Sequence, residues 1–77
     1  MLYKFIKTMR KMAKLSQLEL AKKCNIANST LSGYETGYRE PNFEMLNKIA
    51  NECGFEITFI NKENEILSSS NIDRKEI

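Results

Sequence analysis

The stretch SQLELAKKCNIANSTLSGYETG, residues 16–37, decides the fold that the sequence predicts. Ser16 and Glu19 form an S-x-x-E capping box, in which a serine oxygen and a glutamate carboxylate each satisfy a free backbone N–H at a helix start. Asn25 stands where a helix commonly ends through a left-handed residue, a conformation that asparagine tolerates. A helix of about two turns is therefore expected over residues 16–24.

A second short helix is expected directly after it, over residues 28–35. Ile26, Leu31 and Tyr34 would point inward, and Gly37 just past the end acts as the stop. Two short helices joined by a turn of three or four residues have the helix-turn-helix geometry, whose second helix enters the major groove of DNA.

Two further helices flank this pair. The first, over residues 2–14, has its apolar residues at spacings of three and four, and the last begins after the N-cap Asn42 and ends before Gly54. The apolar residues expected to form the inward stripes are Leu2, Phe5, Ile6, Met9, Met12 and Ala13 in the first helix, and Phe43, Leu46, Ile49, Ala50 and Cys53 in the last.

A β element follows the helices. Residues 55–60 begin as an apolar/polar alternation, residues 61–64 form a turn, and residues 65–67 return, which indicates a hairpin or a single strand. An isolated hairpin is marginal in water and unpaired strand edges invite another chain, so we expect pairing with a second copy, while an intramolecular hairpin remains the alternative. The expected dimerisation residues are Phe55, Ile57, Phe59 and Ile60. Residues 68–77 are expected to be a flexible tail.

The bulk composition limits the function classes. A chain of 77 residues has room for one domain, no apolar run is long enough to span a bilayer, and no export signal is visible, so a cytoplasmic protein is expected. Cys24 and Cys53 are interpreted as buried small hydrophobes. With no histidine and no CxxC, we expect no metal, no cofactor and no enzyme.

The charge is unevenly distributed along the chain. Nine Lys or Arg stand against four Glu up to Lys48, and three basic residues stand against six acidic ones beyond it. This asymmetry fits a domain that presents a basic face to a polyanion, although a solvated lysine-rich helix face has the same pattern.

Residues from Leu15 to Gly54 resemble the lambda-repressor-like family, the Cro/repressor or XRE-type helix-turn-helix proteins. The resemblance predicts a mainly α, compact four-helix domain over residues 1–54, with the strand or hairpin of residues 55–67 as a dimerisation element. The resemblance rests on residues that stand at the spacing of the family's motif: Ser16-Gln17, Leu20-Ala21, Ile26, Ser29-Thr30-Leu31-Ser32, Tyr34-Glu35, Gly37, Arg39, Pro41, Leu46, Ile49-Ala50 and Gly54.

The resemblance implies roles for the matching positions. Residues that usually face the bases are Asn28, Ser29, Ser32 and Gly33, and Asn28 is the leading base reader because asparagine can pair with adenine in two hydrogen bonds. Residues implied to contact the DNA backbone are Arg10, Gln17, Thr36, Tyr38 and Arg39. Glu35 is expected to be structural.

Two departures from the family pattern leave alternatives open. Ala27 stands where the family often has a capping serine or threonine, so Asn28 could itself be the cap and would then not be free to read a base. Gly33 replaces what is often a long polar side chain, so DNA shape could carry more of the specificity. Tyr38 could stack on the sugar-phosphate backbone or cover the loop.

The predicted function is a sequence-specific regulator, a repressor, that binds double-stranded DNA as a homodimer on a palindromic operator. The alternative is an antitoxin that binds a toxin protein and regulates its own operon. A helical scaffold without DNA binding would leave the basic loop and the polar recognition face unexplained.

Overall fold

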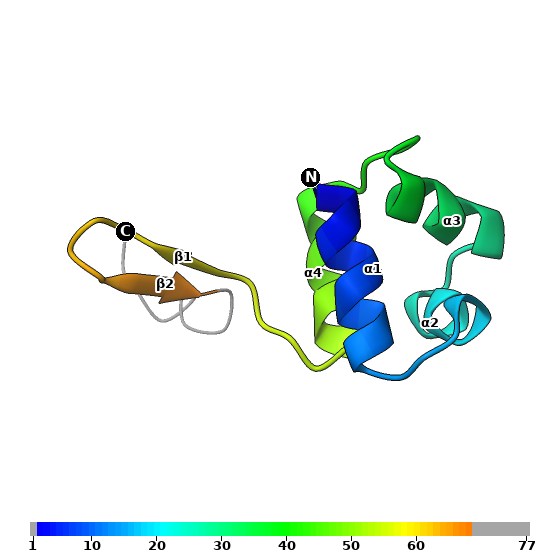
Figure 1. The fold of residues 1–77 in the computed structure, drawn as a ribbon, viewed down its shortest axis with the longest axis horizontal. Helices are drawn as coiled ribbons and strands as arrows, with labels where there is room; N and C mark the ends of the chain where they lie inside the picture. Colours follow the sequence, from blue (N-terminus) through cyan, green and yellow to red (C-terminus); the bar gives the residue numbers. More distant parts are fainter. Residues whose placement is uncertain (1, 69–77) are drawn as a thin grey trace.

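The computed structural model describes residues 2–68, which form four helices and one small hairpin. Figure 1 shows the helices gathered in one body and the hairpin projecting from it. The described part of the chain extends over 38 × 22 × 22 Å. The predicted mainly α fold with a C-terminal β element is confirmed. The elements are α1 (Leu2–Met12), α2 (Gln17–Cys24), α3 (Asn28–Thr36), α4 (Phe43–Glu52), β1 (Thr58–Ile60) and β2 (Ile66–Ser68).

Local signals place the helix ends where the sequence predicts them. Ser16 and Glu19 form the complete capping box, with Glu19 N–H donating to Ser16 Oγ at 3.0 Å and Ser16 N–H donating to Glu19 Oε1 at 2.7 Å. Asn42 caps α4 by accepting the N–H of Met45 at 2.8 Å. Gly54 takes a φ of 84° just past α4, a left-handed conformation that favours glycine.

The first helix is shorter than predicted. It ends at Met12 rather than at residue 14, because Lys14 takes a left-handed φ of 61°. The N–H of Leu15 then donates to Arg10 O at 3.2 Å, which closes the turn toward α2.

The core takes one fully buried large aliphatic side chain from each helix. These are Ile6, Leu20, Leu31 and Ile49, in the order of the helices. Cys24 and Cys53 are buried among them as free thiols, as predicted, and burial raises the pKa of both.

The inward stripes of α1 and α4 are narrower than predicted. Phe5 and Met12 are each 65% exposed and Phe43 is 55% exposed, so the prediction that they point inward is wrong. The remaining apolar residues of α1, with Ile6 at the centre, already fill its contact with the other helices. The three large side chains lie outside that contact.

The β element is an antiparallel hairpin within the chain. Phe59 is opposite Leu67 and Ile60 is opposite Ile66, on strands shorter than the predicted residues 55–60. The strand begins late because Phe55 N–H donates to Ala50 O at 2.8 Å and its side chain packs against the helical core.

The predicted turn over residues 61–64 is present. Asn61 Oδ1 accepts the N–H groups of Glu63 and Glu65, each at 2.9 Å. Ser68, which was expected to begin the flexible tail, is instead a buried member of β2. The rest of that predicted tail, residues 69–77, lies outside the described residues.

Candidate nucleic-acid interface

The turn between α2 and α3 is held by backbone hydrogen bonds around one left-handed residue. Asn25 has a φ of 59°, and its N–H points at the carbonyl oxygens of Ala21 and Lys22. The N–H of Ile26 donates to Ala21 O at 3.0 Å, and the Ile26 side chain packs against the core. These contacts fix the position of α3 relative to α2.

The first turn of α3 presents two uncommitted polar side chains. Ala27 is the N-cap residue, in an extended conformation and with no side-chain cap bond, so the alternative in which Asn28 caps the helix is wrong. Asn28 and Ser29 are exposed, and within residues 2–68 neither side chain has a hydrogen-bond partner. Both groups are therefore available to an external donor or acceptor, such as a base edge.

The second turn of α3 is less open. Leu31 is fully buried and anchors the helix, and Ser32 is half-buried. Gly33 is covered by Arg39: a β-carbon built on Gly33 would lie 2.9 Å from Arg39 Cδ and 3.0 Å from Arg39 Cγ. The N–H of Arg39 also donates to Gly33 O at 3.1 Å. The stem of Arg39 thus occupies the space that a side chain at position 33 would take.

The end of α3 and the loop after it hold the other predicted contacts, Thr36, Tyr38 and Arg39. Gly37 has a φ of 84°, and Tyr3 packs so closely that a β-carbon on Gly37 would lie 3.0 Å from its ring. Thr36 Oγ1 donates to Gly33 O at 3.2 Å and accepts the N–H of Tyr38 at 3.4 Å. The side chain of Tyr38 is 87% exposed, so it does not cover the loop. The tyrosine ring therefore projects into solvent beside a loop whose backbone is hydrogen-bonded to Thr36.

A buried ion pair joins α1 to α3. Arg10 Nε donates to Glu35 Oε2 at 2.6 Å and Arg10 Nη2 donates to Glu35 Oε1 at 3.0 Å, a bidentate arrangement. Arg10 Nη1 donates to Leu15 O at 2.9 Å, and Gln17 Nε2 donates to Glu35 Oε1 at 3.2 Å. Glu35 is structural in this geometry, as the sequence indicates.

This network gives the guanidinium of Arg10 partners within the domain, and its predicted contact with the DNA backbone stays a prediction. Its side chain is 12% exposed, and each of its three guanidinium nitrogens has a partner. The hydrogen bond to Glu35 raises the pKa of Arg10, which favours the charged guanidinium. The geometry favours a positioning role, in which Arg10 holds α3 and the amide of Gln17 in place.

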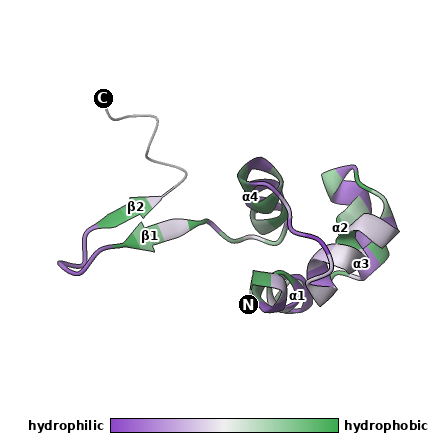
Figure 2. Cartoon of the chain, turned by 90° about the horizontal axis from the view of Figure 1, so that it is seen from above, coloured by the Kyte–Doolittle hydropathy of each residue, from purple (hydrophilic) through white to green (hydrophobic). Residues whose placement is uncertain are grey.

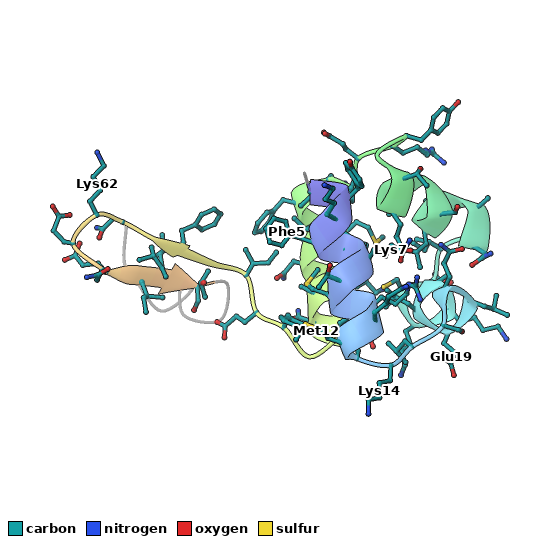
Figure 3. The ribbon with its side chains drawn as sticks, in the orientation of Figure 1. Phe5, Lys7, Met12, Lys14, Glu19 and Lys62 are labelled. Atoms are coloured by element: carbon teal, nitrogen blue, oxygen red, sulfur yellow. The ribbon has the colours of Figure 1, made fainter. Side chains whose placement is uncertain are left out.

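Two candidate contacts on α1, Lys4 and Lys7, escaped the sequence reasoning, whereas Lys11 beside them was expected to contribute to the salt dependence of DNA binding. Lys4, Lys7 and Lys11 line a shallow surface depression beside Glu35. Figure 3 shows Lys7 on the side of α1 that faces α3, opposite to Phe5. The spacing of these lysines at three and four residues is a signal in the sequence for one basic face of a helix.

Comparison with known proteins identifies the family. A family model described as helix-turn-helix matches residues 6–60. The chain belongs to this helix-turn-helix family. A curated relative, the HTH-type transcriptional regulator ImmR of Bacillus subtilis (strain 168), is 33% identical over 70 residues, which are 91% of this chain and 55% of the relative. The chain thus spans about half the length of that relative. No solved structure matches this chain.

The predicted dimerisation residues of this helix-turn-helix chain fall into two pairs. Phe55 and Ile57 are half-buried in the segment that links α4 to the hairpin, whereas Phe59 and Ile60 are 63% and 61% exposed on β1. Of these four residues, only Phe59 and Ile60 are exposed enough to contact another molecule through most of their side-chain surface.

Two other properties concern the described residues only. None of their helices is both long and apolar enough to cross a membrane. Across residues 2–68, no group of three or more His, Cys, Asp or Glu side chains is arranged to hold a metal ion.

Proposed function

We propose that this chain is a sequence-specific, DNA-binding transcriptional regulator that acts as a repressor. The observation that carries the proposal is the exposed, unpartnered pair Asn28 and Ser29 on a short helix that the Arg10–Glu35 ion pair holds in place. Rigid placement lets a side chain form a specific hydrogen bond with a base at small entropic cost. The relative ImmR is itself named a transcriptional regulator.

The roles in this proposal follow the observed exposure. Asn28 and Ser29 read base edges from the first turn of α3, and Ser32 contributes at the edge of the same face. The residues that contact phosphates and sugars, and so fix the register of α3 in the groove, are Gln17 at the start of α2, Thr36 at the end of α3, and the exposed loop residues Tyr38 and Arg39. Gly33 acts by leaving space for Arg39 rather than by meeting a base.

The active form in this proposal is a homodimer on a palindromic operator. A two-fold dimer would place the two copies of α3 about 34 Å apart, one turn of the DNA helix. Residues 55–67 form the dimerisation element, which is supported by the exposed apolar side chains of the hairpin. A small helical domain also gains from a partner, because it buries little apolar surface alone.

Selection from random duplexes tests the proposal. Purified protein should enrich a pseudo-palindromic motif with half-sites about 10 base pairs apart. The Asn28→Ala variant should lose preference at one position of each half-site and bind the original motif about 1–3 kcal/mol more weakly. Asn51→Ala, which changes an exposed asparagine on α4, is the matched control and should select the unchanged motif. Salt-sensitive binding without any enriched motif would overturn sequence-specific regulation.

The second candidate is an antitoxin that binds a toxin protein and regulates its own operon. The exposed apolar hairpin favours it, because such a surface fits a protein partner as well as a second copy. A toxin-like neighbouring gene and a complex of fixed stoichiometry with its product would support this candidate. A stable dimer of this chain alone that does not bind the neighbour's product would count against it.

A further inference from the structure

Large exposed apolar side chains concentrate on two parts of the described structure. Three lie on α1 and α4, at Phe5, Met12 and Phe43, and four lie on the hairpin, at Phe59, Ile60, Ile66 and Leu67, while Leu18 on α2 and Tyr38 in the loop stand apart. Phe5 and Met12 are seven residues apart, so they share one face of α1. Figure 3 shows both on the side of α1 that is turned toward the hairpin.

The hairpin is apolar on both of its faces. Its cross-strand pairs are Phe59 with Leu67 and Ile60 with Ile66. Because neighbouring strand residues point to opposite faces, one pair lies on each face. Figure 2 shows both strands carrying apolar residues, while the turn is polar.

The hairpin stands away from the helices of its own chain. Figure 1 shows it projecting beyond α4 on an extended segment, so the helical body does not cover it. A two-stranded hairpin with three residues in each strand does not have independent stability in water. It needs an apolar surface to pack against.

The exposed apolar surfaces are large enough for an interface between two copies. The five side chains that would meet in it, Phe5, Met12, Phe43, Phe59 and Leu67, are 43% to 65% exposed. At roughly 200 Å² for a free side chain they present roughly 600 Å² per chain, or roughly 1,200 Å² for two copies, which is the lower end of the range for specific interfaces.

We propose that the hairpin of each copy docks on the α1–α4 surface of a second copy. Phe59 and Leu67 then cover Phe5 and Met12 of the other chain, with Phe43 at the border, and the two contacts are related by a two-fold axis. This arrangement deepens the proposed function, because it rests on the dimer assumed there and names the helix face that completes it. It differs from simple strand-to-strand pairing, in which α1 and α4 take no part.

Sedimentation without DNA tests the docking. The protein should be a dimer, and Phe5→Ser and Phe59→Ser should each raise its dissociation constant about tenfold or more. The Phe5→Ser/Phe59→Ser double variant should raise the dissociation constant of the dimer by much less than the product of the two single increases, because the two residues contact each other. Leu18→Ser is the matched control: Leu18 is 53% exposed on α2, away from both surfaces, and its change should leave the dimer intact. All these side chains are exposed, and circular dichroism should confirm an unchanged helix content.

Cross-linking between two singly substituted chains gives an independent reading. A mixture of Met12→Cys and Phe59→Cys chains should form a disulfide-linked heterodimer under mild oxidation, whereas Leu18→Cys with Phe59→Cys should not. A monomer at high concentration, or a dimer indifferent to Phe5→Ser, would overturn the docking. A monomer that still selects a DNA motif would remove the docking and keep the regulator. A dimer that forms these cross-links but selects no DNA motif would keep the docking and remove the sequence-specific regulator.

Discussion

The side chain of Arg39 lies across Gly33, with its Cδ only 2.9 Å from the point where a β-carbon on Gly33 would stand. The loop residue and the helix residue therefore form one unit on the outer face of α3. The absence of a side chain at position 33 sets where the arginine can lie.

Gly33→Ala should weaken DNA binding without weakening the fold. Alanine gains ~1 kcal/mol of helix propensity over glycine, and the group it meets is a flexible side chain that can move aside. The free energy of DNA binding should become less favourable by about 1.5 kcal/mol, the value of one hydrogen bond to a charged group. Arg39→Ala should have the same effect. Thermal unfolding and DNA titration measure the two effects.

The double variant separates this explanation from a direct contact. If Gly33 acts through Arg39, Gly33→Ala should cost nothing further in the Arg39→Ala background. A further loss would mean that the Gly33 backbone itself approaches the DNA. Arg39→Ala should also flatten the salt dependence by about one unit.

Glu35→Ala should strongly destabilise the protein. Arg10 and Glu35 are 12% and 3% exposed, and removing the carboxylate leaves a buried guanidinium without its counter-charge, at a cost of about 3–5 kcal/mol. Urea unfolding measures this. Glu40→Ala, an exposed glutamate in the loop before α4, is the control and should stay within about 0.5 kcal/mol. Equal effects of the two variants would show that the ion pair does not hold α1 to α3.

Ala27→Ser should stabilise the protein. Ala27 has the extended backbone of an N-cap but offers no acceptor to the free N–H groups of α3. A serine oxygen there should add about 0.5–2 kcal/mol, measured by urea unfolding. Asn28 is not the cap, so the variant should select the same DNA motif; a changed motif would indicate that residue 27 also faces the bases.

The capping box should make stability depend on pH on the acid side. The Ser16 N–H donates to Glu19 and lowers the pKa of that carboxyl. A lowered folded-state pKa contributes stability that is present above the ordinary value of 4.5 and is lost as the pH falls through the folded-state value. Glu19→Gln should therefore lose stability less steeply on acidification, and NMR titration of Glu19 should show the lowered pKa directly. Identical pH profiles of the two proteins would contradict this role.

The sequence predicted the features that depend on neighbouring residues. Ser16, Asn25, Gly37, Asn42 and Gly54 each act within one turn of the chain, and the helices begin and end near them. The helix-turn-helix arrangement follows from those local signals.

Features that depend on distant residues could not be predicted in the same way. Periodicity marks Phe5 and Met12 as apolar, but it does not tell whether an apolar side chain faces its own core or another molecule. Arg10 and Glu35 are 25 residues apart, and no local pattern pairs them. The contact of Arg39 with Gly33 likewise exists only because the loop folds back on α3.

The four-helix core has a consequence for cooperativity. Each helix supplies one fully buried large aliphatic side chain, from Ile6 in α1 to Ile49 in α4, so no pair of helices retains a core when the others detach. Unfolding should accordingly be a single all-or-none transition, in which α3 melts together with α4. A peptide restricted to residues 16–37 should be unstructured, so the proposed DNA binding would require the whole helical body.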